Sequence, residues 1–261
     1  MSRVLVVVPT YNERENLDPL ARQILARPDY GMLVVDDQSP DGTGEVADHL
    51  AREFEGRFAV IHRTGRRGLG LSYVEGFRTA LAGDADLICQ MDADFSHDPA
   101  FLPALVKGAE SHDLVVGSRY LNGISVVNWP LRRLILSTLA NRYIRAVTGL
   151  SVRDCTGGFR CWRREALARI PLEAVISDGY AFMVEMLFEA ARRGCSIGEV
   201  PIVFVERRQG SSKLSSAVLW ESVLMPWRLR LRGRLARGRA AGGPRAAPHH
   251  RGEATRGARP W

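Results

Sequence analysis

The chain has 261 residues, of which 46% are hydrophobic and 25% charged, so it is long enough to bury a full core and too apolar to be mostly disordered. Its 25 glycines follow no three-residue period, which excludes a collagen-like chain. The formal net charge of +7 is unevenly placed: residues 226–261 hold ten of the 36 basic side chains and one of the 29 acidic ones, a net of +9. Residues 1–225 therefore carry a net charge of −2, which disfavours a nucleic-acid partner for that part.

Targeting and redox signals are weak in this sequence. No uncharged apolar stretch approaches the roughly twenty residues of a membrane-spanning helix. The apolar run Val4–Val8 is too short for a signal peptide and is soon followed by charge at Glu13. The four cysteines form no C-x-x-C pair and have no histidine at zinc spacing, which predicts reduced thiols. We therefore expect a cytoplasmic protein.

The first 120 residues alternate short β-branched runs with longer segments of helical length and periodicity. The runs predicted as strands are Val4–Val8, Met32–Val35, Phe58–Ile61, Leu87–Met91 and Leu114–Val116. Repeated strand–helix units predict an α/β fold, a Rossmann-like and mostly parallel sheet flanked by helices. In such a sheet, ligands bind at the carboxyl ends of the strands.

After residue 120 the alternation lapses, and we expect a more helical second half. Leu131–Thr148 and Asp178–Arg193 are predicted helices, Ile197–Val205 is a predicted strand, and residues 156–159 form a glycine-containing turn. No linker precedes residue 226 or so. We therefore predict one α/β domain over residues 1–225, followed by a basic tail over residues 226–261.

Polar or acidic residues follow three of the five predicted strands. The first strand ends in residues 9–13, the second in residues 36–43, and the fourth in Asp92-Ala93-Asp94. Each loop alone is an ordinary turn or helix cap. Because the carboxyl ends of parallel strands meet at one sheet edge, their coincidence predicts a ligand site there.

Asp92 and Asp94 lie on the same side of an extended chain, about 7 Å apart along it given the strand rise. Two uncompensated carboxylates repel each other and are costly to desolvate. A divalent cation removes this cost, and hard oxygen ligands favour Mg²⁺ or Mn²⁺. Magnesium usually completes its shell with water and phosphate oxygens, so a diphosphate ligand is the natural partner.

Five ordered motifs carry a resemblance to a known family. They are VPTYNERENL (8–17), VDDQSPDGT (35–43), MDADFSH (91–97), GSRY (117–120) and NWPLRR (128–133). Together they resemble the inverting glycosyltransferases of family two and, more narrowly, the dolichyl- or polyprenyl-phosphate mannose synthases, over roughly residues 3–215. The resemblance implies a GT-A fold, a GDP-mannose donor and a polyprenyl monophosphate acceptor held in a membrane.

The resemblance also implies roles for individual residues. It assigns the donor nucleotide sugar to Pro9, Tyr11, Glu13, Val35, Asp37, Asp92 and Ala93. Asp94 matches the metal-binding carboxylate, and Ser96 stands where some relatives have a glutamine ligand that water could replace. The positions that meet the phosphates are Arg119, Arg133 and Ser137. The basic residues of a segment that closes over the donor are Arg207 and Lys213.

A lipid phosphate needs no general base, because its second ionisation lies near pH 6 and it arrives as an anion. The resemblance implies that a cation on Asp94 stabilises the departing GDP, while Arg119 and Arg133 hold the acceptor phosphate. One displacement then inverts the anomer and gives a β-linked polyprenyl phosphate mannose. His97, close to the metal motif, is predicted to be structural rather than catalytic.

The start of the tail carries an apolar stripe at three- or four-residue spacing, with arginines interleaved. The stripe consists of Trp220, Leu224, Trp227, Leu231 and Leu235. Such a segment predicts peripheral contact with an anionic membrane surface, the inner face of the membrane for a cytoplasmic protein. Beyond Ala240 the composition predicts disorder. Whether a separate membrane partner anchors the protein stays open.

Two alternatives also stay open. The first is a polyprenyl-phosphate glucosyltransferase, or another family-two transferase that uses a UDP-sugar, since a sequence does not directly reveal a hexose epimer. The second is a non-catalytic protein that binds nucleic acid through its basic tail, which the net −2 of residues 1–225 disfavours.

Overall fold

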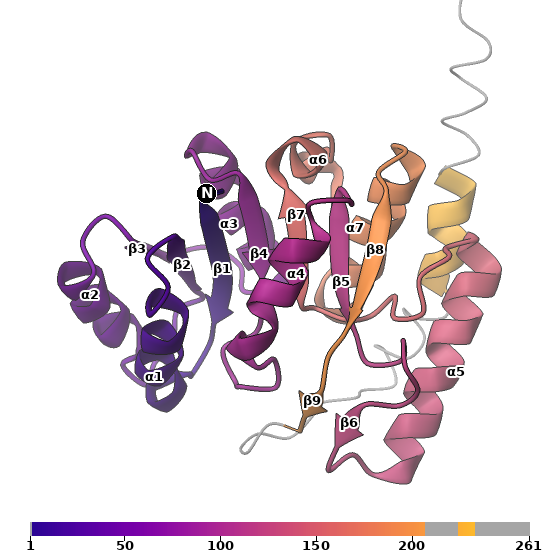
Figure 1. The fold of residues 1–261 in the computed structure, drawn as a ribbon, viewed down its shortest axis with the longest axis horizontal. Coiled ribbons are helices and arrows are strands. Elements are labelled where there is room, and N and C mark those ends of the chain that lie inside the picture. Colours follow the sequence, from indigo (N-terminus) through magenta and orange to yellow (C-terminus); the bar gives the residue numbers. More distant parts are fainter. Residues whose placement is uncertain (1, 207–223, 233–261) are drawn as a thin grey trace, which may run out of the picture.

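The computed structural model describes residues 2–206 and 224–232 of the chain. Its centre is a seven-stranded sheet in the order β3-β2-β1-β4-β7-β5-β8, and a small sheet of β6 and β9 lies below it in Figure 1. The strands are β1 (Val4–Thr10), β2 (Tyr30–Asp36), β3 (Phe58–His62), β4 (Leu87–Gln90), β5 (Leu114–Ser118), β6 (Val126–Val127), β7 (Arg160–Arg163), β8 (Ile197–Pro201) and β9 (Phe204–Val205). The α-helices are α1 (Arg14–Leu25), α2 (Thr43–Glu53), α3 (Leu69–Ala82), α4 (Leu102–Gly108), α5 (Leu131–Thr148), α6 (Arg164–Ala168) and α7 (Gly179–Arg192).

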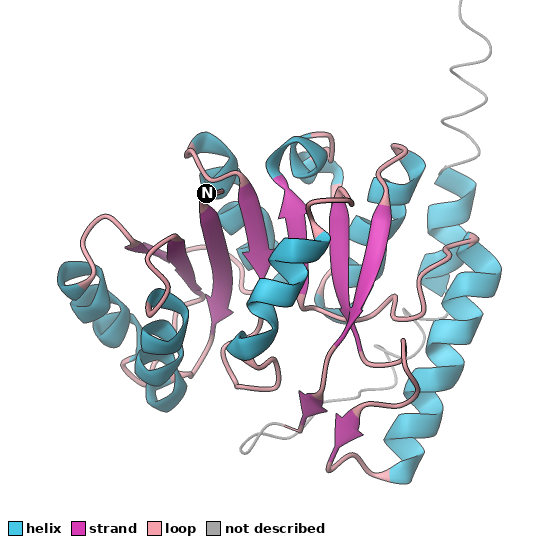
Figure 2. Cartoon of the chain, viewed as in Figure 1, coloured by secondary structure: helices cyan, strands magenta, loops and turns pink. Residues whose placement is uncertain are grey.

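Helices cover both faces of the large sheet (Figure 2). β1 pairs in parallel with β2 and β4, β2 with β3, and β5 with β8. Successive side chains of a strand point to opposite faces, so Val6 and Val8 of β1 pack with α1, α2 and α4, whereas Val7 packs with α3 and α7. This arrangement confirms the predicted α/β fold with a mostly parallel sheet.

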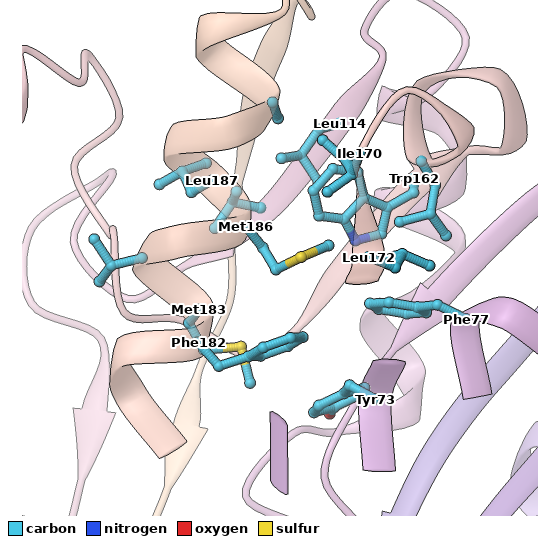
Figure 3. Packing of buried hydrophobic residues seen from close by; sticks show 14 of the residues in the cluster. Tyr73, Phe77, Leu114, Trp162, Ile170, Leu172, Phe182, Met183, Met186 and Leu187 are labelled. Atoms are coloured by element: carbon cyan, nitrogen blue, oxygen red, sulfur yellow. The ribbon is translucent and has the colours of Figure 1, made fainter. Parts of the chain in front are cut away.

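The core on the α3 side is rich in aromatic residues (Figure 3). Tyr73 stacks on Phe182 with ring centroids 5.6 Å apart, and the buried Trp162 donates its indole N–H to Gln90 at 2.9 Å. Helix α3 approaches β1 closely because Gly76 has no side chain; a Cβ there would lie 2.5 Å from Cγ1 of Val7. The packing of α3 and α7 against the sheet supports the loops at the strand ends.

The five strands predicted for the first 120 residues are confirmed, with small shifts at their ends. The prediction of one strand over Ile197–Val205 is wrong, because β8 ends at Pro201 and β9 begins at Phe204 in the other sheet. The partner strand β5 ends at Ser118, so β8 has no neighbour to continue along. The chain therefore crosses from the large sheet to the small one.

The second half holds more strand than expected. β7 lies between β4 and β5 and is antiparallel to both, and the sequence does not predict it. Its four residues, Arg160–Arg163, contain no β-branched side chain and two arginines, so neither composition nor alternation marks them. The two predicted helices of this half are confirmed as α5 and α7.

Residues 224–232 form a helix beside α5 (Figure 1). Met225 and Leu229 are buried in the core, and Arg230 donates to the carbonyl of Val147 on α5. The expected boundary between residues 225 and 226 falls inside this helix. Of the predicted stripe, Leu224, Trp227 and Leu231 are about half exposed, while Trp220 and Leu235 lie outside the described residues. Among the described residues, no helix is long and apolar enough to cross a membrane.

Candidate active site

The site lies where the parallel strands β1, β2 and β4 end. Thr10 and Asp36, the last residues of β1 and β2, are register partners, and the Thr10 hydroxyl donates to the Asp36 carboxylate at 3.1 Å. The hydroxyl of Ser39 donates to the same carboxylate at 2.5 Å. The polar residues that follow β1 and β2 therefore lie at one edge of the sheet, as predicted, and hydrogen bonds connect them.

The predicted donor residues of β1 and β2 occupy different depths. Pro9 is buried in the sheet and paired in register with Val35, whose fully buried side chain belongs to the core. Tyr11 is 44% exposed, and its ring and hydroxyl both contact Arg67. Glu13 is half-buried and accepts from the side-chain amide of Asn16 at 2.7 Å. Of these four side chains, Tyr11 is the one most open to a ligand.

Asp37 is buried and already has partners. One carboxylate oxygen accepts from Arg63, and the other accepts from the backbone N–H of Gly68 at 2.8 Å. The Gly68–Gly70 loop is also held by Asp178, the N-cap of α7, which accepts from the N–H of Gly70 at 2.7 Å. Asp37 thus connects the end of β2 to the loop that begins α3.

The Asp92-Ala93-Asp94 motif follows β4, as predicted. Both carboxylate residues are half-buried, and Ala93 is buried. The hydroxyl of Tyr73 lies 3.3 Å from one oxygen of Asp92, and Asp94 accepts from the backbone N–H of Ser96 at 3.0 Å. The motif therefore presents two carboxylates at the sheet edge.

His97 is buried beneath the Asp92–Asp94 motif and contacts its backbone. Its Nδ1 accepts the backbone N–H of Asp92 at 3.1 Å, and its ring stacks on Phe159 with centroids 5.1 Å apart. Burial lowers the pKa of His97 despite the nearby carboxylates of Asp92 and Asp94. Nδ1 of His97 therefore acts as an acceptor that holds the backbone of Asp92.

The oxygens of this loop fit a hard divalent cation. Ser96, predicted as a further ligand, is buried, and its Oγ has no hydrogen-bond partner among the described residues. An orphaned hydroxyl beside Asp94 is an available oxygen donor. Within the described ranges, no group of three or more His, Cys, Asp or Glu side chains is arranged to hold a metal ion. A cation here would thus need oxygens from water and substrate to complete its shell.

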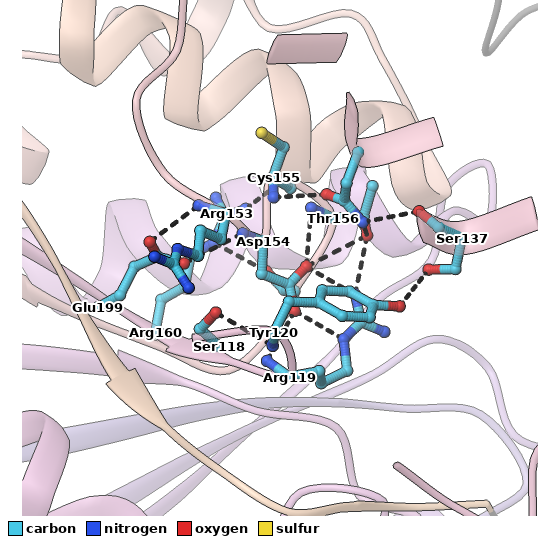
Figure 4. A network of polar contacts seen from close by, with 12 residues as sticks. Ser118, Arg119, Tyr120, Ser137, Arg153, Asp154, Cys155, Thr156, Arg160 and Glu199 are labelled. Carbon is cyan, nitrogen blue, oxygen red and sulfur yellow. Dashed lines mark hydrogen bonds and ion pairs between the residues drawn. The ribbon is translucent and has the colours of Figure 1, made fainter. Parts of the chain in front are cut away.

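Arg119 comes at the end of β5 and is held by a buried carboxylate (Figure 4). Nε and Nη2 of Arg119 donate to the two oxygens of Asp154, at 2.7 Å each, and Nη2 also donates to the hydroxyl of Thr156 at 2.8 Å. Arg119 is 5% exposed and Asp154 is fully buried. The predicted phosphate-binding arginine is therefore fixed in direction by a fork-to-fork ion pair.

The electrostatics of this pair follow from its burial. Desolvation alone would raise the pKa of Asp154, but the charge and hydrogen bonds of Arg119 hold that pKa below its ordinary value. Desolvation alone would lower the pKa of the Arg119 guanidinium. The charge and hydrogen bonds of Asp154 outweigh this effect and raise that pKa. Arg160, fully buried nearby, has its pKa lowered to about 10 by burial. The ion pair thus keeps Arg119 charged inside the protein.

Three aromatic rings surround the guanidinium of Arg119. Its carbon lies 5.5 Å from the ring centroids of Tyr120 and Trp129, and 5.4 Å from that of Phe204. Phe204 belongs to β9, which pairs with β6. The next residue of β9, Val205, donates its backbone N–H to the carbonyl of Ser96, in the loop that follows Asp92 and Asp94. The small sheet therefore connects Arg119 to the Asp92–Asp94 loop.

Arg133 lies in the first turn of α5 and contacts one of these rings, that of Trp129. Its guanidinium carbon is 4.2 Å from the ring centroid of Trp129, and its Nη1 forms an ion pair with Glu206. One turn further, Ser137 accepts a hydrogen bond from the hydroxyl of Tyr120 at 2.7 Å. The three predicted phosphate contacts, Arg119, Arg133 and Ser137, are thus linked through Trp129 and Tyr120. Arg207 and Lys213 lie outside the described residues.

The sequence alone did not single out several residues of this site. Asp154 lies just before the predicted glycine turn and Thr156 is its first residue, but they are 35 and 37 positions from Arg119. Trp129 stands inside the quoted motif 128–133, and Glu206 directly precedes the basic segment. Their positions beside recognised motifs were the one signal available, because the contacts themselves join distant parts of the chain.

Comparisons with known proteins identify relatives of this chain. Residues 5–170 match the family model described as glycosyl transferase family 2. The chain is 45% identical over 239 residues to a polyprenol monophosphomannose synthase of Mycolicibacterium smegmatis, covering 91% of this chain and 90% of the relative. It is 46% identical over 223 residues to an undecaprenyl-phosphate mannosyltransferase of Micrococcus luteus, covering 85% of this chain and 91% of the relative.

Solved structures support the fold. A glucosyl-3-phosphoglycerate synthase from Mycobacterium tuberculosis, in complex with Mn²⁺ and UDP-glucose, superposes with a TM-score of 0.63 at 20% identity, covering 87% of this chain and 79% of that one. The same enzyme with Mn²⁺, UDP and phosphoglyceric acid gives a TM-score of 0.62 over 94% of this chain and 80% of that one. The family model and the two relatives together show that the chain belongs to glycosyltransferase family 2.

Proposed function

We propose that the protein transfers mannose from GDP-mannose to a polyprenyl monophosphate, with inversion at the anomeric carbon. The observation that carries this proposal is the pair of arginines, Arg119 and Arg133, linked through one tryptophan beside the Asp92–Asp94 loop. Two converging guanidinium groups suit a phosphate acceptor. The names of the two close relatives supply the mannose and the polyprenyl phosphate.

The donor would lie along the ends of β1, β2 and β4. Tyr11 and Glu13 would contact the nucleotide from the β1 loop, with Asp37 holding the Gly68 loop in place. Asp94 and the orphaned Oγ of Ser96 would hold Mg²⁺ or Mn²⁺, which when bound offsets negative charge on the departing diphosphate. The complex of a structural neighbour with Mn²⁺ and UDP-glucose supports a divalent cation without selecting one metal.

The acceptor phosphate would be held by Arg119, Arg133 and Ser137. Asp154 fixes the direction of Arg119, so the guanidinium is in place before substrate arrives. A phosphate monoester is anionic near neutral pH, so its oxygen can displace GDP without a general base. The residues of this chain therefore act by positioning two anionic groups and keeping them apart.

The membrane supplies the acceptor, and one side of the molecule fits such a surface. Helix α5 carries exposed apolar side chains on the same stretch as the acceptor residues. They are Leu131, Ile135, Leu136 and Leu139. The neighbouring helix 224–232 adds Leu224, Trp227 and Leu231. We infer that this surface rests on the membrane, with the basic residues after position 232 near anionic headgroups.

A transfer assay tests the donor and acceptor together. The full chain is incubated with radiolabelled GDP-mannose or UDP-glucose and a polyprenyl phosphate, with Mg²⁺, with Mn²⁺ and with a chelator. We expect lipid-linked label from GDP-mannose alone and loss of transfer with the chelator. Label from UDP-glucose alone would assign the glucosyltransferase alternative, and no transfer from either donor would overturn the proposal.

A further inference from the structure

Trp129 lies between the two arginines of the proposed acceptor site. The guanidinium carbon of Arg133 is 4.2 Å from its ring centroid, and that of Arg119 is 5.5 Å away. Two like charges on one ring repel each other, so the arrangement needs compensation. Asp154 supplies it for Arg119 and Glu206 for Arg133. The indole thus joins two ion pairs that come from distant parts of the chain.

The ring of Trp129 also contacts another aromatic ring. It meets Phe204 edge-on, with centroids 5.5 Å apart and an interplanar angle of 75°. Phe204 in turn meets His97 edge-on at 5.5 Å, and His97 accepts the backbone N–H of Asp92. A row of three rings, His97, Phe204 and Trp129, therefore runs from the metal motif to the arginines. This row determines where the indole sits.

The indole N–H is the unexplained part of this arrangement. Nε1 of Trp129 is buried and has no hydrogen-bond partner among the described residues. Leaving a buried donor unpaired is costly, and such groups usually find a partner. Trp162, an indole of the hydrophobic core, follows the rule by donating to Gln90 at 2.9 Å. The contrast between the two tryptophans suggests that the partner of Trp129 is a ligand.

We propose that Trp129 is a further binding residue for the acceptor phosphate, with its N–H donating to a phosphate oxygen while its ring holds Arg119 and Arg133 beside the same group. This inference rests on the proposed function, since it takes the acceptor to be a polyprenyl phosphate. A neutral donor between two cations adds a directed hydrogen bond without adding charge. The site would therefore suit a phosphate group whose oxygens accept hydrogen bonds from Trp129, Arg119 and Arg133.

Two substitutions separate the N–H from the ring. Trp129→Phe keeps an aromatic face for the arginines and removes the donor, whereas Trp129→Leu removes both. A hydrogen bond to a charged group typically contributes enough for about a tenfold change in affinity. We expect Trp129→Phe to weaken binding of farnesyl phosphate about tenfold and Trp129→Leu to weaken it further. The affinity for GDP-mannose should stay unchanged in both.

Phe54 provides a matched control. Its ring also lies between two guanidinium groups, with the carbons of Arg22 and Arg57 at 5.6 and 5.9 Å from its centroid, but it follows α2 at the opposite end of β3 from the site. Phe54→Leu should therefore leave farnesyl phosphate binding unchanged. Retained GDP-mannose binding shows that each variant is folded.

The binding experiment is isothermal titration of the full chain with farnesyl phosphate, with farnesol as the uncharged probe. If the unaltered protein binds GDP-mannose but not farnesyl phosphate, the proposed function fails. If it binds farnesyl phosphate and Trp129→Phe binds it equally well, the role of the N–H is overturned. If Trp129→Leu also binds equally well, or if farnesol binding falls in parallel, Trp129 is no part of a phosphate site.

Discussion

Both carboxylate oxygens of Asp154 accept hydrogen bonds from the guanidinium of Arg119, and one of them also accepts the backbone N–H of Arg119 at 3.1 Å. The charge of Arg119, which we propose to bind the acceptor phosphate, is thus held by a carboxylate that is fully buried. Because both groups are buried, neither can be removed without leaving the other unpaired.

Asp154→Asn should destabilise the protein by about 3–5 kcal/mol near neutral pH, because the buried Arg119 then lacks a counter-ion. The measurement is urea unfolding of the variant and the unaltered protein at several pH values. The pKa of Asp154 is lower in the folded protein than its ordinary value of 3.8. Its contribution is therefore complete above that value and is lost as the pH falls through the lower folded pKa.

The difference between the two proteins should accordingly shrink below about pH 4. Asp84→Asn serves as the control, since Asp84 pairs with Arg3 while 72% of its side chain is exposed. That variant should lose less than about 1 kcal/mol. An Asp154 variant as stable as the Asp84 variant would contradict the assigned role.

Asp94→Asn should lower transfer at least about a hundredfold while leaving thermal unfolding unchanged, because the half-buried carboxylate is the main protein ligand of the proposed cation. Initial rates at saturating metal test this. Asp98→Asn is a suitable control: Asp98 lies four residues on and is exposed, and its carboxylate caps the turn at Ala100 with a bond of 2.8 Å. A near-normal rate for Asp94→Asn would remove the metal from the mechanism.

Glu206→Gln should lower the KM for polyprenyl phosphate by up to about fivefold, because in the unaltered protein the Glu206 carboxylate competes with the acceptor phosphate for Arg133. The KM for GDP-mannose should stay unchanged. Steady-state kinetics with each substrate varied in turn provide the test. A higher acceptor KM would mean instead that Glu206 positions Arg133 for the phosphate.

Replacing Leu131 and Leu139 with serine should weaken association with anionic phospholipid vesicles about tenfold, because both side chains are more than half exposed and would lose apolar contact with the bilayer. Co-sedimentation with vesicles measures this. Leu71→Ser, at an exposed leucine of α3, is the matched control. Equal sedimentation of all three proteins would place the membrane contact elsewhere.

Much of the fold could be predicted because its signals are local. The β-branched runs at Val4–Val8 and Met32–Val35 are buried on both faces of a parallel sheet, and burial on both faces requires near-continuous apolar residues. β7 escaped prediction because its residues, Arg160–Arg163, are stabilised by neighbours on both sides rather than by their own propensity. The end of β8 likewise depends on where β5 stops.

The candidate site divides in the same way. Asp92 and Asp94 could be proposed from the chain alone, since two carboxylates at the end of a buried strand suit a cation. Arg119 and Arg133 could be proposed only through the motifs that resemble family-two glycosyltransferases. What the chain order could not reveal is how those groups are held: Asp154 beside Arg119, and Trp129 between the two arginines.

The division has one physical cause. Hydrophobic period, turn residues and net charge act over a few neighbouring residues, so the α/β class, the polar strand ends and the basic tail are legible in the amino-acid order. Ion pairs and ring contacts act through space between residues that can be distant in the sequence: Arg119 lies 10 positions from Trp129 and 85 from Phe204. Only the folding of β5, β9 and the segment that leads into α5 against one another brings them within 6 Å.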